Sequence, residues 1–273
     1  MMAFVHHLTY DFRTGIRDRS RLLMLYLFPL VFFAIAGGLM VSINPGFPQM
    51  MVPAMAMFAF LCAALLTFPG SLVSAREAGI FRSYRVNGVP SASILSIPVI
   101  GTAVHMAVVT VIVWAAAVRV FGGASPVNAV AFAIAALLSY AAYAGIGVLI
   151  GVAAGSSTVS TLVGQLIYIP SIILGGLMVP SSALPPGLQR VALLFPSTHG
   201  MRLFMSLSMG GAAHPFPLLS LCVLLTGTLV SFLLAGLLFQ WDAEPGRPAG
   251  VAYLALIAAA PFAAAAAIGG LHY

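Results

Sequence analysis

The segment Arg76–Pro90, "REAGIFRSYRVNGVP", is a short polar island between two long apolar stretches of the chain. Neither Leu22–Ala75 before it nor Val86–Val118 after it contains Asp, Glu, Lys or Arg. Apolar runs of this length cross a lipid bilayer as helices, because about 20 apolar residues span its hydrocarbon core. The order of the three segments therefore predicts two spans joined by a polar turn at the membrane surface.

The island itself has the features of a short helix. Glu77 lies at its start, Arg82 and Arg85 lie about one helical turn apart, and Gly88-Val89-Pro90 is a stop signal. We predict a surface helix within residues 74–90 that presents its side chains to a partner in the cytosol.

The composition indicates a membrane protein throughout. The 273 residues are 62% apolar and only 6% charged, with a mean hydropathy of +1.11. Soluble domains carry about 25% charged residues. All eleven basic residues are Arg, and most charges lie near the ends of apolar runs. The net charge of +6 therefore gives no reason to expect a nucleic-acid partner.

The hydropathy pattern predicts an all-α polytopic membrane protein with a six-helix bundle and one further candidate span. The last candidate is Ala-rich, is interrupted by Pro261, and lies in a C-terminal extension at 241–273. The seven candidates lie at about 22–42, 51–73, 93–118, 128–152, 159–179, 218–239 and 251–271.

The distribution of Arg predicts a cytosolic N-terminus, because cytosolic loops are enriched in basic residues. In this orientation the cytosolic side carries eight Arg and the outer side three. The first group is Arg13, Arg17, Arg19, Arg21, Arg76, Arg82, Arg85 and Arg247, and the second is Arg119, Arg190 and Arg202. The all-Arg, Ala- and Gly-rich composition is typical of a high-GC bacterial genome, so we expect a bacterial inner or plasma membrane.

Residues 1–20 form a predicted interfacial helix with an apolar stripe and a roughly opposite basic stripe. Such a helix lies in the plane of the membrane surface; the alternative is a frayed tail that only obeys the positive-inside bias. The apolar stripe is Phe4, Leu8, Phe12 and Ile16, and the basic stripe is Arg13, Arg17 and Arg21.

The segment 181–214 is long for a loop between spans and predicts an external re-entrant hairpin. Pro185-Pro186 starts a short helix that Pro196 stops, and a second helix follows over Met201–Met209. His199 and Arg202 lie three residues apart, either on a lid that meets the substrate or as an anchor among lipid head groups.

Three features together resemble the permease subunits of ABC-2 type ABC exporters, from the N-terminus to about residue 240. They are the interfacial helix, the loop after the second span and the segment after the fifth. The loop, "AREAGIFRSYRVNGVPSAS", resembles the family pattern "ERExGTLRxLRxTPVS". The later segment, "LGGLMVPSSALPPGLQRVALLFPSTHGMRLF", resembles "SGxxFPxxxLPxxLRxxAxxxPxTYxxxxLR".

The resemblance assigns roles to particular residues within a transmembrane domain at 1–240. It implies that Glu77, Gly79, Arg82 and Arg85 belong to a coupling helix that docks on a separate ATPase subunit. It also places Pro185, Leu188, Arg190, Pro196 and Arg202 on the external re-entrant segment.

The resemblance further implies an ATP-driven exporter in which two permease copies, identical or paralogous, join two ATPase subunits. ATP and Mg would be bound by the ATPase, because this chain has no Lys and no G-x-x-x-x-G-K-[ST] motif. The chain is therefore not an enzyme by itself. We expect a hydrophobic or amphipathic substrate such as a drug, antibiotic or secondary metabolite; the alternative is a lipid or lipid-linked saccharide.

Relatives carry the substrate cavity between the second and fifth spans, which here offers Met55, Phe58, Gln165 and Tyr168. Their aromatic, thioether and amide groups suit an adaptable apolar site. The alternative for each of the four is ordinary packing between helices.

Two alternative functions belong to other classes of membrane protein. An ion-coupled secondary transporter usually has ionisable groups at mid-membrane, and here His105 is the candidate. An intramembrane enzyme needs converging carboxylates or metal ligands, but the five acidic residues all lie outside the predicted spans. We therefore expect no catalytic residue and no metal site.

Overall fold

The computed structural model describes residues 2–210, 217–242 and 253–269, and every regular element among them is a helix. Six helices are long and apolar enough to cross a membrane, which confirms the predicted all-α polytopic bundle. They are Arg19–Ile43, Phe47–Glu77, Ser91–Phe121, Ala129–Ala153, Ser157–Leu174 and Pro217–Leu238.

Two of these spans contain more than one element, because π-helical turns interrupt the α-helices. The elements in chain order are α1 Met2–Arg17, α2 Arg19–Leu22, η1 Leu23–Leu27, α3 Phe28–Ile43, α4 Phe47–Leu61, η2 Cys62–Thr67, α5 Phe68–Glu77, α6 Ile80–Val86, α7 Ser91–Phe121, α8 Ala129–Ala153, α9 Ser157–Leu174, η3 Ser181–Ala183, α10 Pro186–Ala192, α11 Pro196–Leu203, η4 Phe204–Ser208, α12 Pro217–Leu238, η5 Leu256–Ala259 and α14 Ala260–Gly269.

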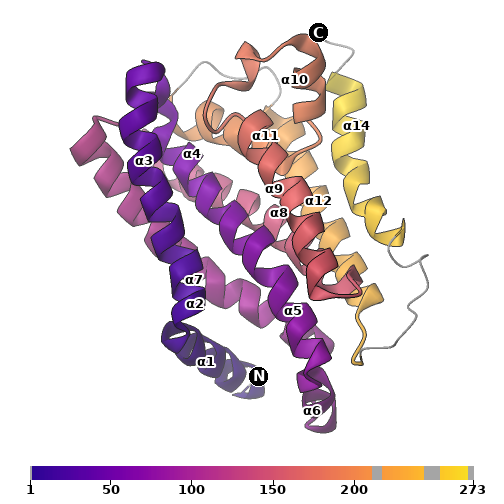
Figure 1. Cartoon of the computed structure of the whole chain (residues 1–273). Coiled ribbons are helices and arrows are strands. Elements are labelled where there is room, and N and C mark those ends of the chain that lie inside the picture. Colours follow the sequence, from indigo (N-terminus) through magenta and orange to yellow (C-terminus); the bar gives the residue numbers. More distant parts are fainter. Residues whose placement is uncertain (1, 211–216, 243–252, 270–273) are drawn as a thin grey trace.

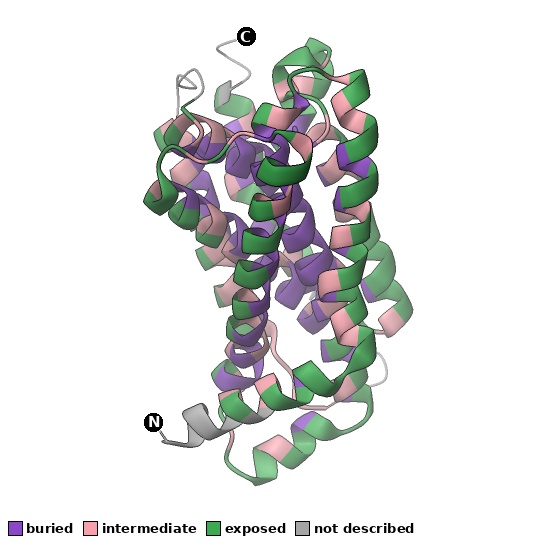
Figure 2. Ribbon diagram, turned by 90° about the vertical axis from the view of Figure 1, so that its left-hand side faces the viewer, coloured by how far each residue is buried: buried purple, intermediate pink, exposed green. Residues whose placement is uncertain are grey.

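The span formed by α4, η2 and α5 is the core of the bundle. Its most apolar window is 89% buried, against 28% for the span that contains α3 and 22% for α9. Helices α7 and α8 contact this central span, and Figure 2 shows the buried residues concentrated in the middle of the molecule. The outer faces of α3, α9 and α12 remain apolar and exposed, as lipid contact requires.

Glycine residues allow the neighbouring helices to approach the backbone of the central span closely. A Cβ atom at Gly147 of α8 would lie 2.0 Å from the carbonyl oxygen of Ala64, and one at Gly164 of α9 would lie 2.6 Å from that of Leu65. Helices in membranes associate through such small residues, since lipid tails are as apolar as the side chains. Gly147 and Gly164 therefore serve helix packing within the subunit.

Two of the π-helical turns immediately precede a Phe-Pro pair. Segment η1 is followed by Phe28-Pro29, and η2 by Phe68-Pro69. A proline inside a helix has no N–H for the carbonyl four residues earlier, and its ring crowds that carbonyl. A wider π-helical turn relieves this crowding without ending the span.

The two ends of the bundle are built differently (Figure 1). Helices α1 and α6 lie at one end, below called the α6 end, and α10 lies at the other, the α10 end. Helix α1 runs across the bundle and contacts α7, and its position at a membrane surface stays a prediction. Of its predicted apolar stripe, the side chain of Phe4 lies outside the described residues.

Within the candidate seventh span, an apolar helix covers Tyr253–Ile268. The predicted ends of this span, 251–252 and 270–271, lie outside the described residues, so spanning stays a prediction. The helix packs along α12, where Gly227 makes room for the ring of Phe262, and α14 also contacts α10.

The prediction that Pro196 stops a helix is wrong. Helix α10 ends at Ala192, and Pro196 is instead the first residue of α11. Proline suits this position because its missing N–H is not needed in the first turn. The fifth span also ends at Leu174 rather than near 179, and Gly176 follows with a φ of 81°, which favours glycine.

We predict that Gly147→Ala lowers the free energy of unfolding by about 1–3 kcal/mol, because backbone atoms must move to admit the methyl group. Gly38→Ala on α3 is the matched control, since a Cβ there meets nothing within 4 Å. Thermal unfolding in detergent measures both. Equal melting temperatures for the two variants would contradict the proposed close contact.

Candidate functional site

At the α6 end, the chain bends sharply between the central span and helix α6. Residues 76–86, which include this bend, are below called the elbow. Helix α5 continues to Glu77, and Gly79 has a φ of 71°, in the left-handed region that only glycine adopts freely. Helix α6 then begins at Ile80. Glu77 therefore ends the span, and the prediction that it starts the surface helix is wrong.

Arg76 in the last turn of α5 is buried and binds the end of α8. Its Nη1 donates to the carbonyl of Val152 over 3.0 Å, and its Nη2 donates to the carbonyl of Ala154. The last carbonyls of a helix have no partner within the helix, and the C-terminus carries partial negative charge. The guanidinium thus satisfies both the hydrogen-bonding and the electrostatic requirements of this helix end.

Glu77 contacts the start of α9, on the other side of the loop that joins α8 to α9. The Oγ of Ser157 donates to its Oε2 over 3.4 Å, and the Ser74 hydroxyl lies 3.5 Å from that of Ser157. A carboxylate near a helix N-terminus is favourable because that end carries partial positive charge. Two adjacent charges of the elbow therefore join it to the α8–α9 loop.

Helix α6 is also held against the end of α12. The ring of Phe81 is buried and lies 5.4 Å from that of Phe239, which in turn contacts Trp241. Arg82 Nε donates to Asp242 Oδ1 over 2.8 Å. The Arg82 side chain is 73% exposed, so this ion pair contributes little stability. The aromatic contact is the stronger of the two attachments.

The opposite surface of α6 is open. Arg85 and Ser83 are exposed, and Val86 is 83% exposed at the helix end. Gly88 has a φ of 70° and turns the chain toward α7. The predicted coupling residues thus lie on one elbow, with Arg85 on its open surface and Glu77 and Arg82 also engaged in contacts within the subunit.

The predicted cavity residues are packed differently. Met55 and Phe58 are fully buried, Tyr168 is half-buried, and Gln165 is exposed. The ring of Phe58 stacks on Phe32 at 3.8 Å and lies 6.1 Å from that of Tyr168. These contacts form an aromatic cluster across α3, α4 and α9, and a role in substrate binding stays a prediction.

A separate apolar cavity of about 500 Å³ lies between α8, α9 and the helix at 253–268. Ile150, Val163, Phe195 and Leu256 contribute to its walls. None of the four predicted cavity residues lines it.

The re-entrant segment at the α10 end is attached to α8 by a buried hydroxyl network. Tyr143 Oη donates to Ser171 Oγ over 2.9 Å and accepts from the backbone N–H of Ser197 over 2.9 Å. Ser197 Oγ in turn donates to the carbonyl of Ser171. The N–H of Ser197 belongs to the first turn of α11, where no carbonyl within the helix is available. Tyr143 therefore caps this helix.

The predicted residues of the re-entrant segment occupy different environments. His199 is completely buried and its ring nitrogens lie 2.9 Å from the Leu193 carbonyl and 3.4 Å from Ser220 Oγ. Pro185 precedes α10, Arg190 is exposed in its last turn, and Arg202 is half-buried. His199 is therefore part of the hairpin's internal packing.

His105 of α7 takes part in the attachment of the N-terminal helices. Its Nδ1 lies 2.7 Å from the Tyr26 hydroxyl, and its ring stacks on Phe12 of α1 at 5.1 Å. Nearby, Arg21 contacts Asp11 and Thr102. Arg21 thus faces α7, whereas the sequence pattern placed it on the outward basic stripe.

The most informative residues that sequence reasoning left unassigned are Arg76, Tyr143 and Asp242. Arg76 binds main-chain carbonyls, and Tyr143 binds a main-chain N–H besides the Ser171 hydroxyl, so neither has a charged partner to search for in the sequence. Asp242 lies 160 residues from its partner Arg82. The only sequence feature that could have singled out Arg76 is its position directly after an apolar run.

These features define a polytopic helical membrane protein with a helical elbow at one end and a pair of short helices, α10 and α11, at the other. The family model of the ABC-2 type transporter matches residues 3–209, which include both features. The protein belongs to this family and is a membrane permease component of an ABC transporter. No curated protein matches the chain.

We predict that Arg76→Met lowers the free energy of unfolding by about 1.5–3 kcal/mol, because two carbonyls lose a charged donor. Arg85→Met removes the same charge from an exposed site and should have little effect. Thermal unfolding in detergent compares them. If the two variants melt together, Arg76 does not hold the α8 end.

Tyr143→Phe tests the cap of α11. The substitution leaves the buried N–H of Ser197 without an acceptor, which costs about 1–3 kcal/mol. We expect a lower melting temperature and faster hydrogen exchange in α11. Tyr253→Phe, at a 69% exposed position, is the control. Unchanged exchange in α11 would contradict the assignment.

Proposed function

We propose that this chain is the permease subunit of an ATP-driven exporter that moves a hydrophobic or amphipathic molecule out of the cell. The observation that carries the proposal is the elbow, whose α6 surface is open while its other contacts reach three spans. In the assembly the α6 end faces the cytosol, as the Arg distribution favours. A separate ATPase subunit docks there and holds the ATP and Mg.

The contacts suggest how force on α6 reaches the membrane. Arg76 and Glu77 pass it to the ends of α8 and α9, and Phe81 passes it to α12. Helix α5 continues into η2, a π-helical turn that adjusts more readily than an α-helix. Closure of two ATPase subunits would thus tilt the central span against its neighbours.

The substrate path lies between two permease copies, identical or paralogous, with the aromatic cluster near it. Phe28 and Phe32 extend that cluster from Phe58 toward the exposed side of α3. Rings favour a flat or hydrophobic substrate such as a drug, antibiotic or secondary metabolite. A lipid or lipid-linked saccharide remains the second candidate, because the same surfaces face the bilayer.

An ion-coupled carrier is the rival from another class. His105 is its candidate proton site, but the ring is committed to Tyr26 and Phe12 in the attachment of α1. These observations favour external energy from ATP.

The first experiment is purification of the tagged chain from its host in mild detergent. We expect an ATPase with a P-loop to co-purify in near-equal amount. A monodisperse permease without any such partner would overturn the ATP-driven assignment and direct attention to His105.

Glu77→Ala and Arg82→Ala test the elbow. Each should lower substrate-stimulated ATP hydrolysis several-fold while the amount of folded protein changes little, because both side chains are exposed. Arg119→Ala, at the far end of α7, is the matched control for lost positive charge.

Asp242→Ala separates two roles of Arg82. It removes the internal partner but leaves the guanidinium for the ATPase, so coupling should largely survive if Arg82 docks. An equal loss in Arg82→Ala and Asp242→Ala would show that Arg82 acts through the contact with α12. Full hydrolysis and transport in Glu77→Ala or Arg82→Ala would overturn the docking assignment.

A further inference from the structure

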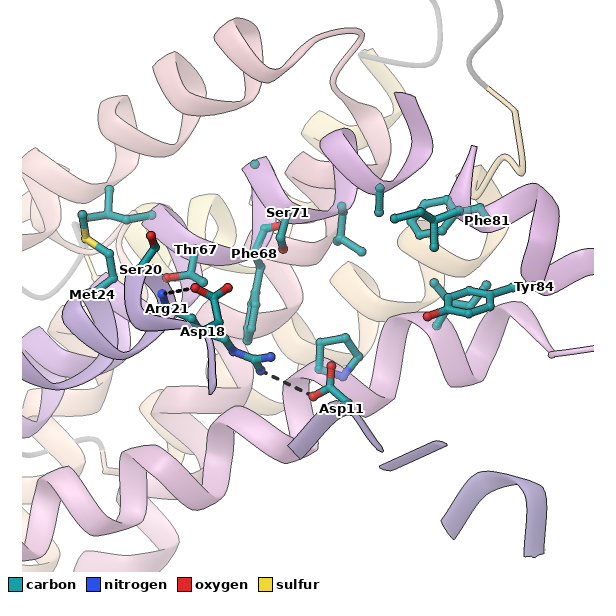
Figure 3. A pocket seen from close by; sticks show the side chains of 17 residues that line it. Asp11, Asp18, Ser20, Arg21, Met24, Thr67, Phe68, Ser71, Phe81 and Tyr84 are labelled. Carbon is teal, nitrogen blue, oxygen red and sulfur yellow. Dashed lines mark hydrogen bonds and ion pairs between the residues drawn. The ribbon is translucent and has the colours of Figure 1, made fainter. Parts of the chain in front are cut away.

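A second cavity, of about 460 Å³, lies at the α6 end between the N-terminal helices and the elbow (Figure 3). Its walls come from α1, α2, η1, η2, α5, α6 and α7. Met55, Phe58, Gln165 and Tyr168 do not line it, so it lies outside the predicted substrate path. It is therefore a separate candidate site, and its chemistry follows from its lining.

One part of the cavity is polar and rich in hydrogen-bond acceptors. Asp18 lies at its edge and uses Oδ1 to accept from the Arg21 N–H over 3.1 Å. The hydroxyls of Thr67 and Ser71 donate to the carbonyls of Cys62 and Phe68, so their oxygen lone pairs remain as acceptors. These groups suit a ligand that donates hydrogen bonds.

The charge balance of the lining favours a cation over an anion. It contains two carboxylates, Asp11 and Asp18, and one guanidinium, that of Arg21. Arg21 already contacts Asp11 at 3.5 Å and donates to Thr102 over 3.1 Å, so it is engaged within the subunit. The exposed arginines of the same segment, Arg13, Arg17 and Arg19, do not line the cavity.

The rest of the cavity is apolar and aromatic. Figure 3 places Phe68 beside the polar part and Phe81 and Tyr84 at the α6 side. Further apolar side chains of the lining are Met24, Leu66, Leu72, Ala75, Ile80, Ile94 and Pro98. Aromatic faces attract an ammonium group as well as packing against hydrocarbon. A molecule with a charged head and an apolar body matches both parts.

We propose that this cavity binds an amphipathic amine. Its ammonium group lies against the carboxylate of Asp18 and the hydroxyls of Thr67 and Ser71, and its apolar body extends past Phe68 toward Phe81 and Tyr84. The occupant then contacts the elbow directly, so its binding is sensed where the ATPase docks. Both a resident aminophospholipid and a soluble amine have this chemistry.

The test uses the purified permease in nanodiscs of phosphatidylcholine and phosphatidylglycerol, with dodecylamine that carries a diazirine in its chain. We expect saturable photolabelling of residues on α5 and α6, located by mass spectrometry. The matched dodecanol probe should label without saturation at these positions. Equal concentration dependence for the two probes would overturn the proposal. No ATPase is required, so failure here leaves the exporter proposal untouched.

Two substitutions test the assigned position of the ammonium group. Asp18→Asn keeps a good N-cap for α2 but removes the charge, and should raise the half-saturating concentration about tenfold or more. Asp242→Asn removes one acidic charge outside the cavity and should change nothing. Unaltered labelling in Asp18→Asn would overturn the assignment of the ammonium site.

Gly70→Leu tests the cavity itself. Gly70 lines it, and a Cβ there meets no atom within 4 Å, so the larger side chain enters open space and should abolish saturable labelling without unfolding the chain. Persistent saturable labelling would overturn the location.

Nanodiscs that also contain phosphatidylethanolamine then distinguish the sources. Competition by this lipid identifies a resident aminophospholipid, and undiminished labelling identifies a soluble amine. Both outcomes support the amine site.

Discussion

The contact between Arg76 and the last carbonyls of α8 is the interaction on which the elbow depends. It places a buried positive charge where the main chain supplies negative partial charge, so both requirements of a buried ion are met within one contact. The central span cannot move at this end without moving α8 or breaking those bonds. Glu77, the next residue, makes the corresponding contact with α9.

Helix α8 extends this connection toward the opposite end of the bundle. Its last carbonyls bind Arg76, Gly147 lies against the backbone of η2, and Tyr143 caps α11 of the re-entrant hairpin. These three contacts lie along one rigid element. A displacement of the elbow therefore has a continuous mechanical route to the hairpin, through packing and hydrogen bonds that are all internal to one subunit.

Much of this arrangement could be predicted from the sequence because the bilayer imposes strong rules. Span number follows from the length of apolar runs, and the elbow follows from the charges of Arg76–Pro90 with Gly79 inside. The two short helices of the hairpin were also predictable, but their boundary was not. Pro196 can end one helix or begin the next, and only the packing of α11 on Tyr143 decides between them.

The α8–α9 loop shows why the remaining contacts escape sequence reasoning. Gly155-Ser156-Ser157-Thr158 carries no charge, which in isolation argues against a role in coupling. The structure supplies the charges from the opposing helix, since Arg76 donates to two carbonyls at the end of α8 and Glu77 accepts from the Ser157 hydroxyl. Every residue has a main-chain carbonyl, so no residue type in the sequence indicates which carbonyl accepts the hydrogen bond. An uncharged loop is thus compatible with tight coupling, provided that the opposing helix brings both signs of charge to it.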